Sequence, residues 1–386
     1  MKMKSILVGL LLLGSLHSLF AQLTIPSDGS DGAFNPASNV EIDLSLATSN
    51  PAIIWSDSNA GNTGKGIYDR DKWAVVFKYS SVNIPAGVTV TFKNHPSHAP
   101  VVWLVQGGVT VAGTVSLNGK NGVSGPSGVF LTEPGPGGFR GAAYGPSGDG
   151  VGLGIGGGRN NESGLYSSVY GNPQIFPLIG GSGGGPYFGA TTGGGGGGVI
   201  LIAASSTIQV VGSITALGGV AQRSGSGGAI KLIADQITGN GSLNSGTEGR
   251  LRIESNALSA TVTTSPSTIR VAPGPTPTIF QSNTSPVVRV ASVDAVNAPA
   301  DPLAPLDTSA DIAIQKNTPV TVVLETRNFA TAGAVVSVRI TQKFGSYTTM
   351  NATLDGGGTT TLSTWRVNNV TIAPGFTTLQ ARATAP

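Results

Sequence analysis

A repeated pattern of short hydrophobic strands constrains this chain more than any other feature. The copies are VVWLVQGGVTVAGTVSLN from Val101, VILIAASSTIQVVGSITALGG from Val199 and AIKLIADQITGNGSLNSG from Ala229. Each copy runs from a hydrophobic strand through a polar break to a β-branched pair, a Gly or Asn corner, a second short strand and a glycine-rich end. Because such copies recur at roughly 20–30 residues, they predict a coil of stacked turns, with one turn per repeat.

The domain organisation follows from changes in composition along the chain. We predict a signal peptide at 1–21, an N-terminal cap at 22–70, a parallel coil at 71–272 with a glycine-rich insert at 119–198, a linker and edge strand at 273–317, and a C-terminal part at 318–386. In the last part, alternating residues such as Val336, Val338 and Ile340 share one apolar face. Short strands of this kind with turn signals between them predict a small antiparallel β-sandwich. Helix signals are almost absent, so the chain is predicted to be all-β.

The first residues have the pattern of an export signal. Lys2 and Lys4 form a basic start, Ile6–Leu16 form an apolar stretch, and Ala21 is a small residue suited to a cleavage site. We therefore expect a mature protein that is secreted or held at a bacterial cell surface. No later segment has the length and apolar composition of a membrane span, so none is expected.

The low charge of the chain limits the classes of molecule that we expect it to bind. The chain has 22 basic and 19 acidic residues, and loss of Lys2 and Lys4 with the signal would leave a net charge of about +1. No cluster of lysine and arginine is present, which argues against nucleic-acid binding. A surface with 11% charged residues suits a neutral polymer such as a polysaccharide, and equally suits no ligand. Because the chain has no cysteine, we expect neither disulfides nor a lipoprotein anchor.

The insert at 119–198 holds about half of the 58 glycines, without the strict three-residue period of collagen. Aromatic residues are spread through it, whereas flexible linkers are poor in aromatics. We therefore expect an ordered, close-packed layer that lies against one face of the coil. Such a layer would cover the outer side of the strands at Val101 and Val199, which are apolar on both faces.

The stretch from Trp73 to about Asn256 resembles a right-handed parallel β-helix of the pectin-lyase-like type. The segments SDGSDGAFNP, AVVFKYSSVNIPAGVTVTFKN and GPGGFRGA, with the glycine run before VILIA, are similar to those of exported glycine-rich bacterial proteins of uncharacterised function. The resemblance implies the fold and carries no catalytic residue to this chain. Because pectin-lyase-like folds serve lyases, glycosidases, tailspikes and adhesins alike, it leaves the function open.

Two pairs of acidic residues are candidate sites. Asp28 and Asp31 in SDGSDG offer oxygen ligands for Ca²⁺, the one cofactor we consider, but a pair of acid–glycine turns is the favoured interpretation. Asp69 and Asp71 in YDRDKW are two residues apart, so on a strand both would face one side and could act as acid and base. For them an exposed turn before the coil is favoured.

Two histidines and one arginine are further candidates. His95 and His98 in KNHPSHAP could ligate a metal, but no third ligand is nearby in the sequence, and a solvated corner between turns is favoured. The resemblance to β-helix lyases implies a basic residue that removes a sugar proton, and Arg140 in GPGGFRGA could take that role. Because arginine stays protonated, we favour bonds from Arg140 to loop carbonyls, and keep the residue as a ligand-binding candidate.

The tyrosines of the insert are the remaining ligand-binding candidates. Tyr144, Tyr166 and Tyr187 each offer a ring face and a hydroxyl to a sugar, although most aromatics of the insert are expected to pack the layer onto the coil. No Ser–His–Asp set, P-loop or dinucleotide fingerprint with supporting context is present.

Three functions remain open at this point. The leading hypothesis is an exported, non-enzymatic structural or adhesive protein of the cell surface or matrix that contacts extracellular polysaccharide or another surface component. The alternatives are a polysaccharide lyase or glycosidase on a β-helix scaffold, and a non-catalytic carbohydrate-binding module.

Overall fold

The computed structural model describes residues 23–124, 132–142, 152–158, 170–187, 191–246, 248–299, 311–316, 318–342, 348–356, 358–374 and 377–385. The predicted signal peptide therefore lies outside the described residues. Over the described ranges the chain forms strands and two short 3₁₀ helices, η1 (Leu44–Leu46) and η2 (Ala60–Asn62), and no α-helix. The prediction of an all-β chain is confirmed.

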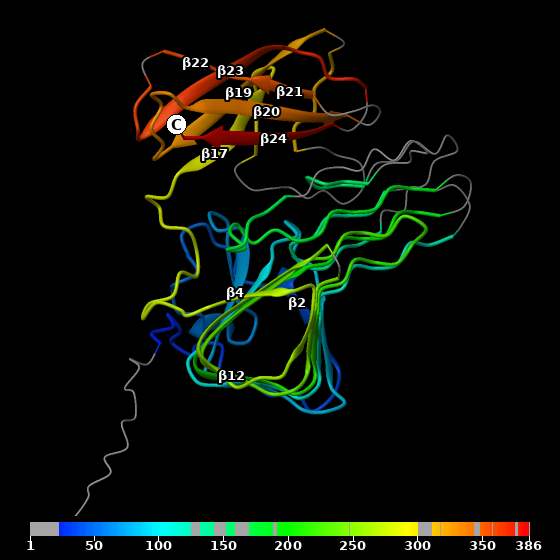
Figure 1. Ribbon diagram of the computed structural model, residues 1–386, viewed down its shortest axis with the longest axis vertical. Coiled ribbons are helices and arrows are strands. Elements are labelled where there is room, and N and C mark those ends of the chain that lie inside the picture. Colours follow the sequence, from blue (N-terminus) through cyan, green and yellow to red (C-terminus); the bar gives the residue numbers. More distant parts are fainter. Residues whose placement is uncertain are drawn as a thin grey trace, which may run out of the picture.

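The N-terminal two thirds contain two sheets of mainly parallel strands (Figure 1). The first sheet has parallel strands β4 (Ala74–Tyr79), β7 (Val101–Val105), β10 (Val199–Val210), β12 (Ala229–Thr238), β14 (Arg250–Leu258) and β16 (Thr268–Val271), joined by β1 (Ala33–Phe34), β5 (Ser81–Ile84) and β8 (Val109–Val111), with β3 (Ile67–Asp69) antiparallel to β4. The second sheet has β2 (Val40–Asp43), β6 (Thr89–Lys93), β9 (Thr114–Ser116), β11 (Ser213–Thr215), β13 (Ser242–Asn244) and β15 (Thr263–Ser265). Successive passes of the chain thus add to both sheets: the early passes give two strands to the first sheet, such as β7 and β8, and the later passes give one, such as β10 or β12.

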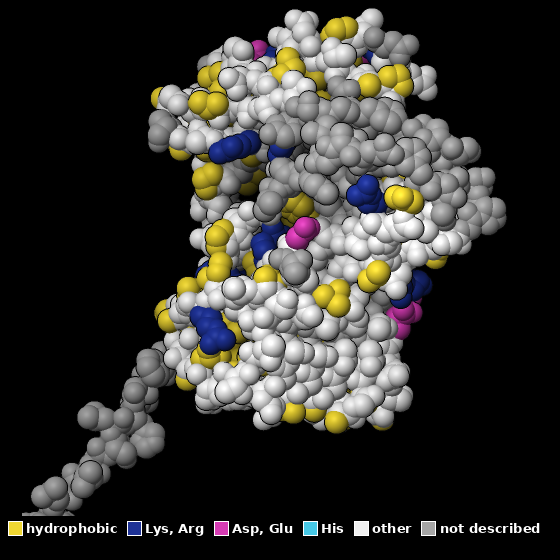
Figure 2. All heavy atoms as spheres, turned by 45° about the vertical axis from the view of Figure 1, so that its right-hand side comes forward, with side chains coloured by type: hydrophobic (Ala, Val, Ile, Leu, Met, Phe, Trp, Pro, Cys, Tyr) yellow, Lys and Arg dark blue, Asp and Glu magenta, His cyan; other side chains and the backbone are white. Residues whose placement is uncertain are grey.

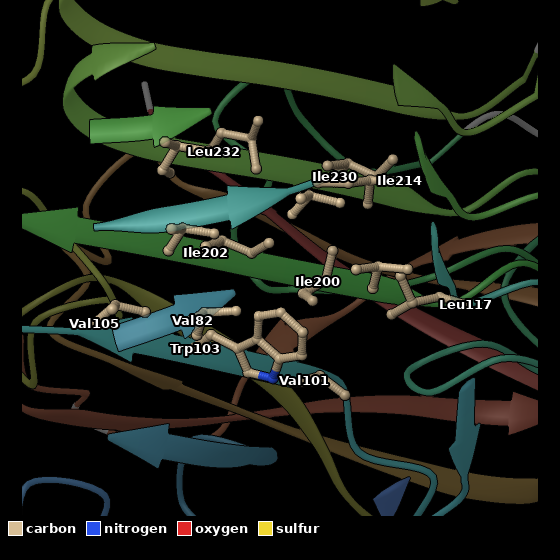
Figure 3. Packing of buried hydrophobic residues seen from close by; sticks show 14 of the residues in the cluster. Val82, Val101, Trp103, Val105, Leu117, Ile200, Ile202, Ile214, Ile230 and Leu232 are labelled. Atoms are coloured by element: carbon tan, nitrogen blue, oxygen red, sulfur yellow. The ribbon is translucent and has the colours of Figure 1, made fainter. Parts of the chain in front are cut away.

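The core lies between these sheets and is built by stacking of equivalent residues. Alternate residues of each strand point inward. Ile202 pairs in register with Trp103 of the preceding pass and with Leu232 of the next. Figure 3 shows these side chains gathered on the inner face. The stacking of like residues is what the repeated hydrophobic pattern predicts.

The outer faces of the same strands are also buried, as predicted, but the cover differs from the expectation. Val102 and Leu201 belong to a second apolar cluster. That cluster is completed by Leu23 and Ile25 before the first strand, Ile175 and Leu178 from the insert, and Ile279 after the last parallel strand. Three segments far apart in the sequence therefore supply apolar cover, and one of them, with Ile175 and Leu178, belongs to the insert, as was expected.

The glycines form a separate arrangement, which we call the glycine layer: the segments 117–123, 132–142, 180–184, 192–198 and 217–228. The central segment, 192–198, is neither helix nor strand. At 2.6–3.0 Å, the N–H groups of Gly193, Gly196 and Val199 donate to the carbonyls of Ala142, Phe139 and Pro136; those of Gly194 and Gly197 to Arg223 and Ser226; and those of Gly195 and Gly198 to Lys120 and Leu117. Successive N–H groups thus donate to three neighbouring segments in turn, and the pattern repeats every three residues. Three residues per turn without internal hydrogen bonds is the geometry of polyproline II.

Only glycine fits in the middle of this layer, because the segments approach backbone to backbone. A Cβ built on Gly195 would lie 2.1 Å from the Glu133 carbonyl oxygen, and one on Gly196 would lie 1.9 Å from that of Gly181. The segments 117–123 and 192–198 adjoin β9 and β10 directly. The layer thus continues the passes of the parallel sheets and extends sideways from them in Figure 1.

The C-terminal part contains two antiparallel sheets. The larger has the order β18 (Val296–Asn297), β17 (Val287–Val293), β19 (Val320–Arg327), β23 (Leu362–Val370) and β22 (Thr353–Leu354), and the smaller has β21 (Thr348–Asn351), β20 (Val335–Gln342) and β24 (Thr377–Thr384). Val322 and Trp365 of the larger sheet and Val338 of the smaller belong to one apolar cluster. Val336 and Ile340 are buried with Val338, as the alternating pattern predicts.

The glycine layer leads to a stability prediction. We expect Gly195→Ala to lower the free energy of unfolding by at least about 3 kcal/mol, because the new methyl group would force two backbone segments apart. Gly61→Ala is the matched control, since a Cβ there meets nothing within 4 Å. Urea unfolding monitored by circular dichroism measures both variants. Equal unfolding midpoints would contradict the close packing of the layer.

Candidate functional site

A hollow of about 140 Å³ at the N-terminal end of the parallel sheets brings together two motifs that the sequence analysis treated separately. Its lining includes Tyr68, Asp69 and Arg70 at the end of β3, His95 after β6, and Ser49. Strand β3 ends at Asp69, so Asp71 lies in the following turn and the alternation of a strand does not apply to it.

The two carboxylates of YDRDKW have different surroundings. Asp69 is buried, and its oxygens accept hydrogen bonds from the backbone N–H groups of Trp55 and Lys72, each at 3.0 Å. The Asp71 side chain is 84% exposed and lies 4.0 Å from Arg70 Nε. Asp69 therefore holds two loops together, while Asp71 faces solvent. Both residues line the hollow, but the Asp69 carboxylate is engaged by two backbone N–H groups whereas Asp71 is mostly in solvent, so the two acids have unequal surroundings.

His95 is buried, which corrects the expectation of a solvated corner. The Ser97 backbone N–H donates to His95 Nδ1 at 3.1 Å, so the neutral ring carries its proton on Nε2, which lies 3.4 Å from Ser49 Oγ. The ring stacks on Tyr68 with the centroids 4.0 Å apart. These contacts fix the wall of the hollow, because the imidazole is packed and bonded on each of its polar atoms.

His98 is buried as well, in a cluster that ties the glycine layer to the corner after β6. Arg140 Nη2 contacts Glu133 Oε1, and His98 Nε2 lies 3.9 Å from Glu133 Oε2. Asn94 Nδ2 donates to the Pro134 carbonyl at 2.9 Å. Arg140 was a candidate for ligand binding, but its side chain is only 3% exposed. Its guanidinium is therefore directed to Glu133 inside the protein, which corrects that prediction.

Burial is the largest cause that lowers the pKa of His98, and together with the electrostatic effects of the neighbouring Arg140 and His95 it brings the pKa to about 4. At neutral pH the ring is therefore uncharged, and the 3.9 Å approach to Glu133 is not an ion pair. This environment could not be predicted from the sequence, because Glu133 and Arg140 are distant from His98 along the chain.

Asp28 and Asp31 take part in the fold of the N-terminal segment. Asp31 is buried, and its carboxylate accepts hydrogen bonds from Asn59 Nδ2 at 2.6 Å and from the backbone N–H of Lys78 at 2.7 Å. Asp28 Oδ1 accepts from the Ser30 backbone N–H at 3.0 Å, as in an acid–glycine turn, and Asp28 Oδ2 lies 3.6 Å from Lys78 Nζ. In the part of the chain that the structure describes, no three His, Asp or Glu side chains gather in a way that could hold a metal ion. The contacts of Asp28 match the interpretation as an acid–glycine turn, and those of Asp31 hold the N-terminal segment.

Of the three candidate tyrosines, Tyr144 and Tyr166 lie outside the described residues. Tyr187 is 39% exposed, and its backbone N–H donates to the Thr191 carbonyl at 3.2 Å. Val123, at the end of the segment 117–123, and Val220, in the neighbouring segment 217–228, are exposed as well. The carbonyls of these two valines accept from the backbone N–H groups of Thr192 and Gly122. We call Val123, Tyr187 and Val220 the tip of the layer.

Sequence reasoning missed a buried charged group on the outer face of the first sheet. Lys231 is 1% exposed, lies 3.2 Å from Glu254 Oε1, and places its Nζ 3.8 Å from the centroid of the Phe176 ring. Arg250 Nη2 donates to the Ile179 carbonyl at 2.8 Å. These contacts anchor the segment that covers the sheet. The signal in the sequence was a lysine in the middle of the apolar run AIKLIA.

Comparison with family models, with curated proteins and with solved structures finds no match to this chain. Among the described residues, no helix has the length and apolar character needed to cross a bilayer.

The surroundings of His98 predict a pH dependence of stability. Because the pKa is about 4 in the folded state and near 6.5 in the unfolded state, the unfolded chain binds the proton first as the pH falls. Stability attributable to His98 is complete above pH 6.5 and is lost between about pH 6.5 and 4, by about 3 kcal/mol.

The matched variant is His98→Asn, since His98 has a φ of 52° and asparagine tolerates this left-handed conformation. Urea unfolding at pH 7 and pH 4 compares the two proteins. We expect the variant to lose less stability on acidification than the natural protein. Parallel pH profiles would contradict the neutral, buried state of His98.

Proposed function

We propose that this protein is an exported bacterial protein that acts as a non-enzymatic structural or adhesive element at the cell surface or in a matrix, with extracellular polysaccharide as its ligand class. We further propose that the parallel part is a right-handed β-helix of the pectin-lyase-like type and that the C-terminal part is a β-sandwich. The stacked parallel ladders support the first of these fold proposals. The apolar cluster shared by two antiparallel sheets supports the second.

One observation carries the functional proposal: the polar groups that chemistry would need are used to hold the fold. Asp69 bonds two backbone N–H groups, Asp31 bonds the N-terminal segment to β4, and Arg140 is buried against Glu133. Asp69 also lines the hollow, but its two oxygens are engaged by the backbone N–H groups of Trp55 and Lys72, so its carboxylate serves the fold. Because these side chains make structural contacts, they support the role of a scaffold more than the role of an enzyme.

The tip of the glycine layer supports an adhesive role. Tyr187, Val123 and Val220 are exposed at the end of a layer in which each segment is hydrogen-bonded to its neighbours. A rigid support lowers the conformational entropy lost on binding. An exposed tyrosine beside aliphatic side chains suits the apolar face of a sugar ring, with the hydroxyl free to bond to the sugar.

A glycan array, read together with an assay for cleavage products on the same glycans, tests this function. We expect binding without cleavage, unchanged by Ca²⁺. Tyr187→Ala and Val220→Ser should weaken binding, whereas Val335→Ser, at an exposed valine of the C-terminal part, should leave it unchanged. Release of sugar products would contradict the proposal and favour a lyase or glycosidase. Binding that survives both tip variants would place the contact elsewhere.

A further inference from the structure

The segment between the parallel sheets and the C-terminal part is held in place, although the sequence predicts a linker there. The Thr24 backbone N–H donates to the Pro275 carbonyl at 3.2 Å. Pro277 and Ile279 are buried, and Ile279 belongs to the apolar cluster on the outer face of the first sheet. The first half of this segment is therefore part of the cover of the parallel sheets.

The second half of the segment meets both parts of the molecule at a group of residues that we call the junction: Trp55, Lys72, Phe280, Asn283 and Asn328. The rings of Trp55 and Phe280 are in contact, with their centroids 5.1 Å apart. Lys72 Nζ donates to the Gln281 carbonyl at 3.3 Å and to Asn283 Oδ1 at 3.1 Å. Because Trp55 and Lys72 lie in loops before β4, these contacts fix the segment to the parallel part.

Asn283 is bound to the C-terminal part as well. Asn328, which follows β19, donates through Nδ2 to the Asn283 carbonyl at 2.6 Å and to the Ser285 carbonyl at 3.2 Å. The side chain and the carbonyl of Asn283 thus contact different parts of the molecule. Residues 284–286 alone separate Asn283 from β17, and the Ser285 N–H donates to the Ser282 carbonyl at 2.9 Å. Within these described residues the chain has no free length in which a hinge could lie.

Prolines stiffen the segment between these contacts. A proline ring holds φ near about −65° and restricts the residue before it to extended conformations. Pro275 and Pro277 lie before the junction, and Pro286 lies between Ser285 and β17. Linkers rich in proline behave as semi-rigid spacers, whereas linkers of glycine and serine are flexible. The composition of the segment therefore adds to the restraint that the hydrogen bonds impose.

The buried carboxylate of Asp69 positions the two junction residues that come from the parallel part. Its oxygens accept hydrogen bonds from the backbone N–H groups of Trp55 and Lys72, each at 3.0 Å. The side chains of the same two residues contact Phe280 and Asn283. The hydrogen bonds of Asp69 therefore determine where the segment is held, which gives this buried acid a structural role beyond its own loop.

The junction is the feature best placed to orient the two parts. Domains that are joined by a linker are expected to move relative to one another unless a large apolar interface connects them. In Figure 1 the segment, drawn in yellow, passes from the parallel part to the C-terminal part on one side of the molecule. Figure 2 shows charged side chains scattered over the visible face rather than gathered into extended patches. Attraction between charged patches is therefore not what holds the parts together on that face.

We propose that the junction holds the C-terminal part in one orientation relative to the parallel part, so that the two move as a single rigid body. Asp69 is the positioning residue of the junction, and Asn283 is the residue through which the two parts are connected. The tip of the glycine layer then keeps a fixed direction relative to the C-terminal part. This inference is separate from polysaccharide contact, since the junction shares no residue with the tip.

The distance between two spin labels tests the proposal directly. Because the chain has no cysteine, Val211→Cys and Val335→Cys create one labelling site in each part, and both valines are exposed. Double electron–electron resonance on the labelled protein measures the distribution of distances between the two sites. We expect a single narrow distribution. A broad distribution in this protein, with the junction intact, would overturn the proposal.

A double variant shows whether the junction is responsible. Lys72→Ala with Asn328→Gly removes the side chains on either side of Asn283, and glycine readily adopts the φ of 51° found at Asn328. The matched control is Lys316→Ala with Asn369→Gly. Lys316 is paired with Asp294 inside the C-terminal part, and Asn369 is an exposed residue with a φ of 58°. We expect the narrow distribution to be lost in the junction variant and kept in the control, with unchanged circular dichroism in both.

Asp69→Asn tests the positioning role of the buried acid. The amide has the size of the carboxylate but only one acceptor oxygen, so it cannot accept from both backbone N–H groups. We expect the distance distribution to broaden, whereas Lys72→Arg, which keeps a donor at the junction, should leave it narrow. Equal, narrow distributions in the double junction variant and its control would overturn the proposal. A narrow distribution in Asp69→Asn would overturn the role assigned to Asp69.

Discussion

The hydrogen bonds donated by the central glycine segment at 192–198 hold together parts of the chain that have no side-chain core in common. Buried backbone N–H groups must find acceptors, and here they find them in three neighbouring segments in turn. The arrangement requires side chains to be absent, because a Cβ at these positions would collide with backbone. The same chain then enters β10, the strand that joins both halves of the first sheet. The layer and the parallel sheets are in this way one hydrogen-bonded stack.

Much of the architecture could be predicted from local patterns. The repeats beginning at Val101, Val199 and Ala229 align in the structure within one residue, since Val101 pairs with Ile200 and Ala229 with Val199. Equivalent positions in a repeat face equivalent environments, so a pattern of alternation carries this information. The same reasoning identified the buried face of β20, with Val336, Val338 and Ile340.

The surroundings of individual polar side chains could not be predicted in this way. His95 and His98 were expected in solvent because their segment has the composition of a corner, yet both are covered by residues from other parts of the chain. Arg140 is paired with Glu133, and Asp31 is bonded to the backbone of Lys78. Neither contact can be inferred from a local sequence pattern. Contacts with distant parts of the chain decide whether a titratable group is available to a ligand or is used to stabilise the fold. Here these groups stabilise the fold. The surface that remains available for recognition is the tip of the glycine layer, where Val123, Tyr187 and Val220 are exposed.

Amide hydrogen exchange of the central glycine segment tests this account most directly. If the N–H groups of residues 193–198 are held as the structure has them, they should exchange as slowly as those of the adjoining strand β10, because both would open only with the stack as a whole. Exchange of the glycines at the rate of an unstructured chain, while β10 stays protected, would show that the layer does not hold the molecule together and would contradict the account.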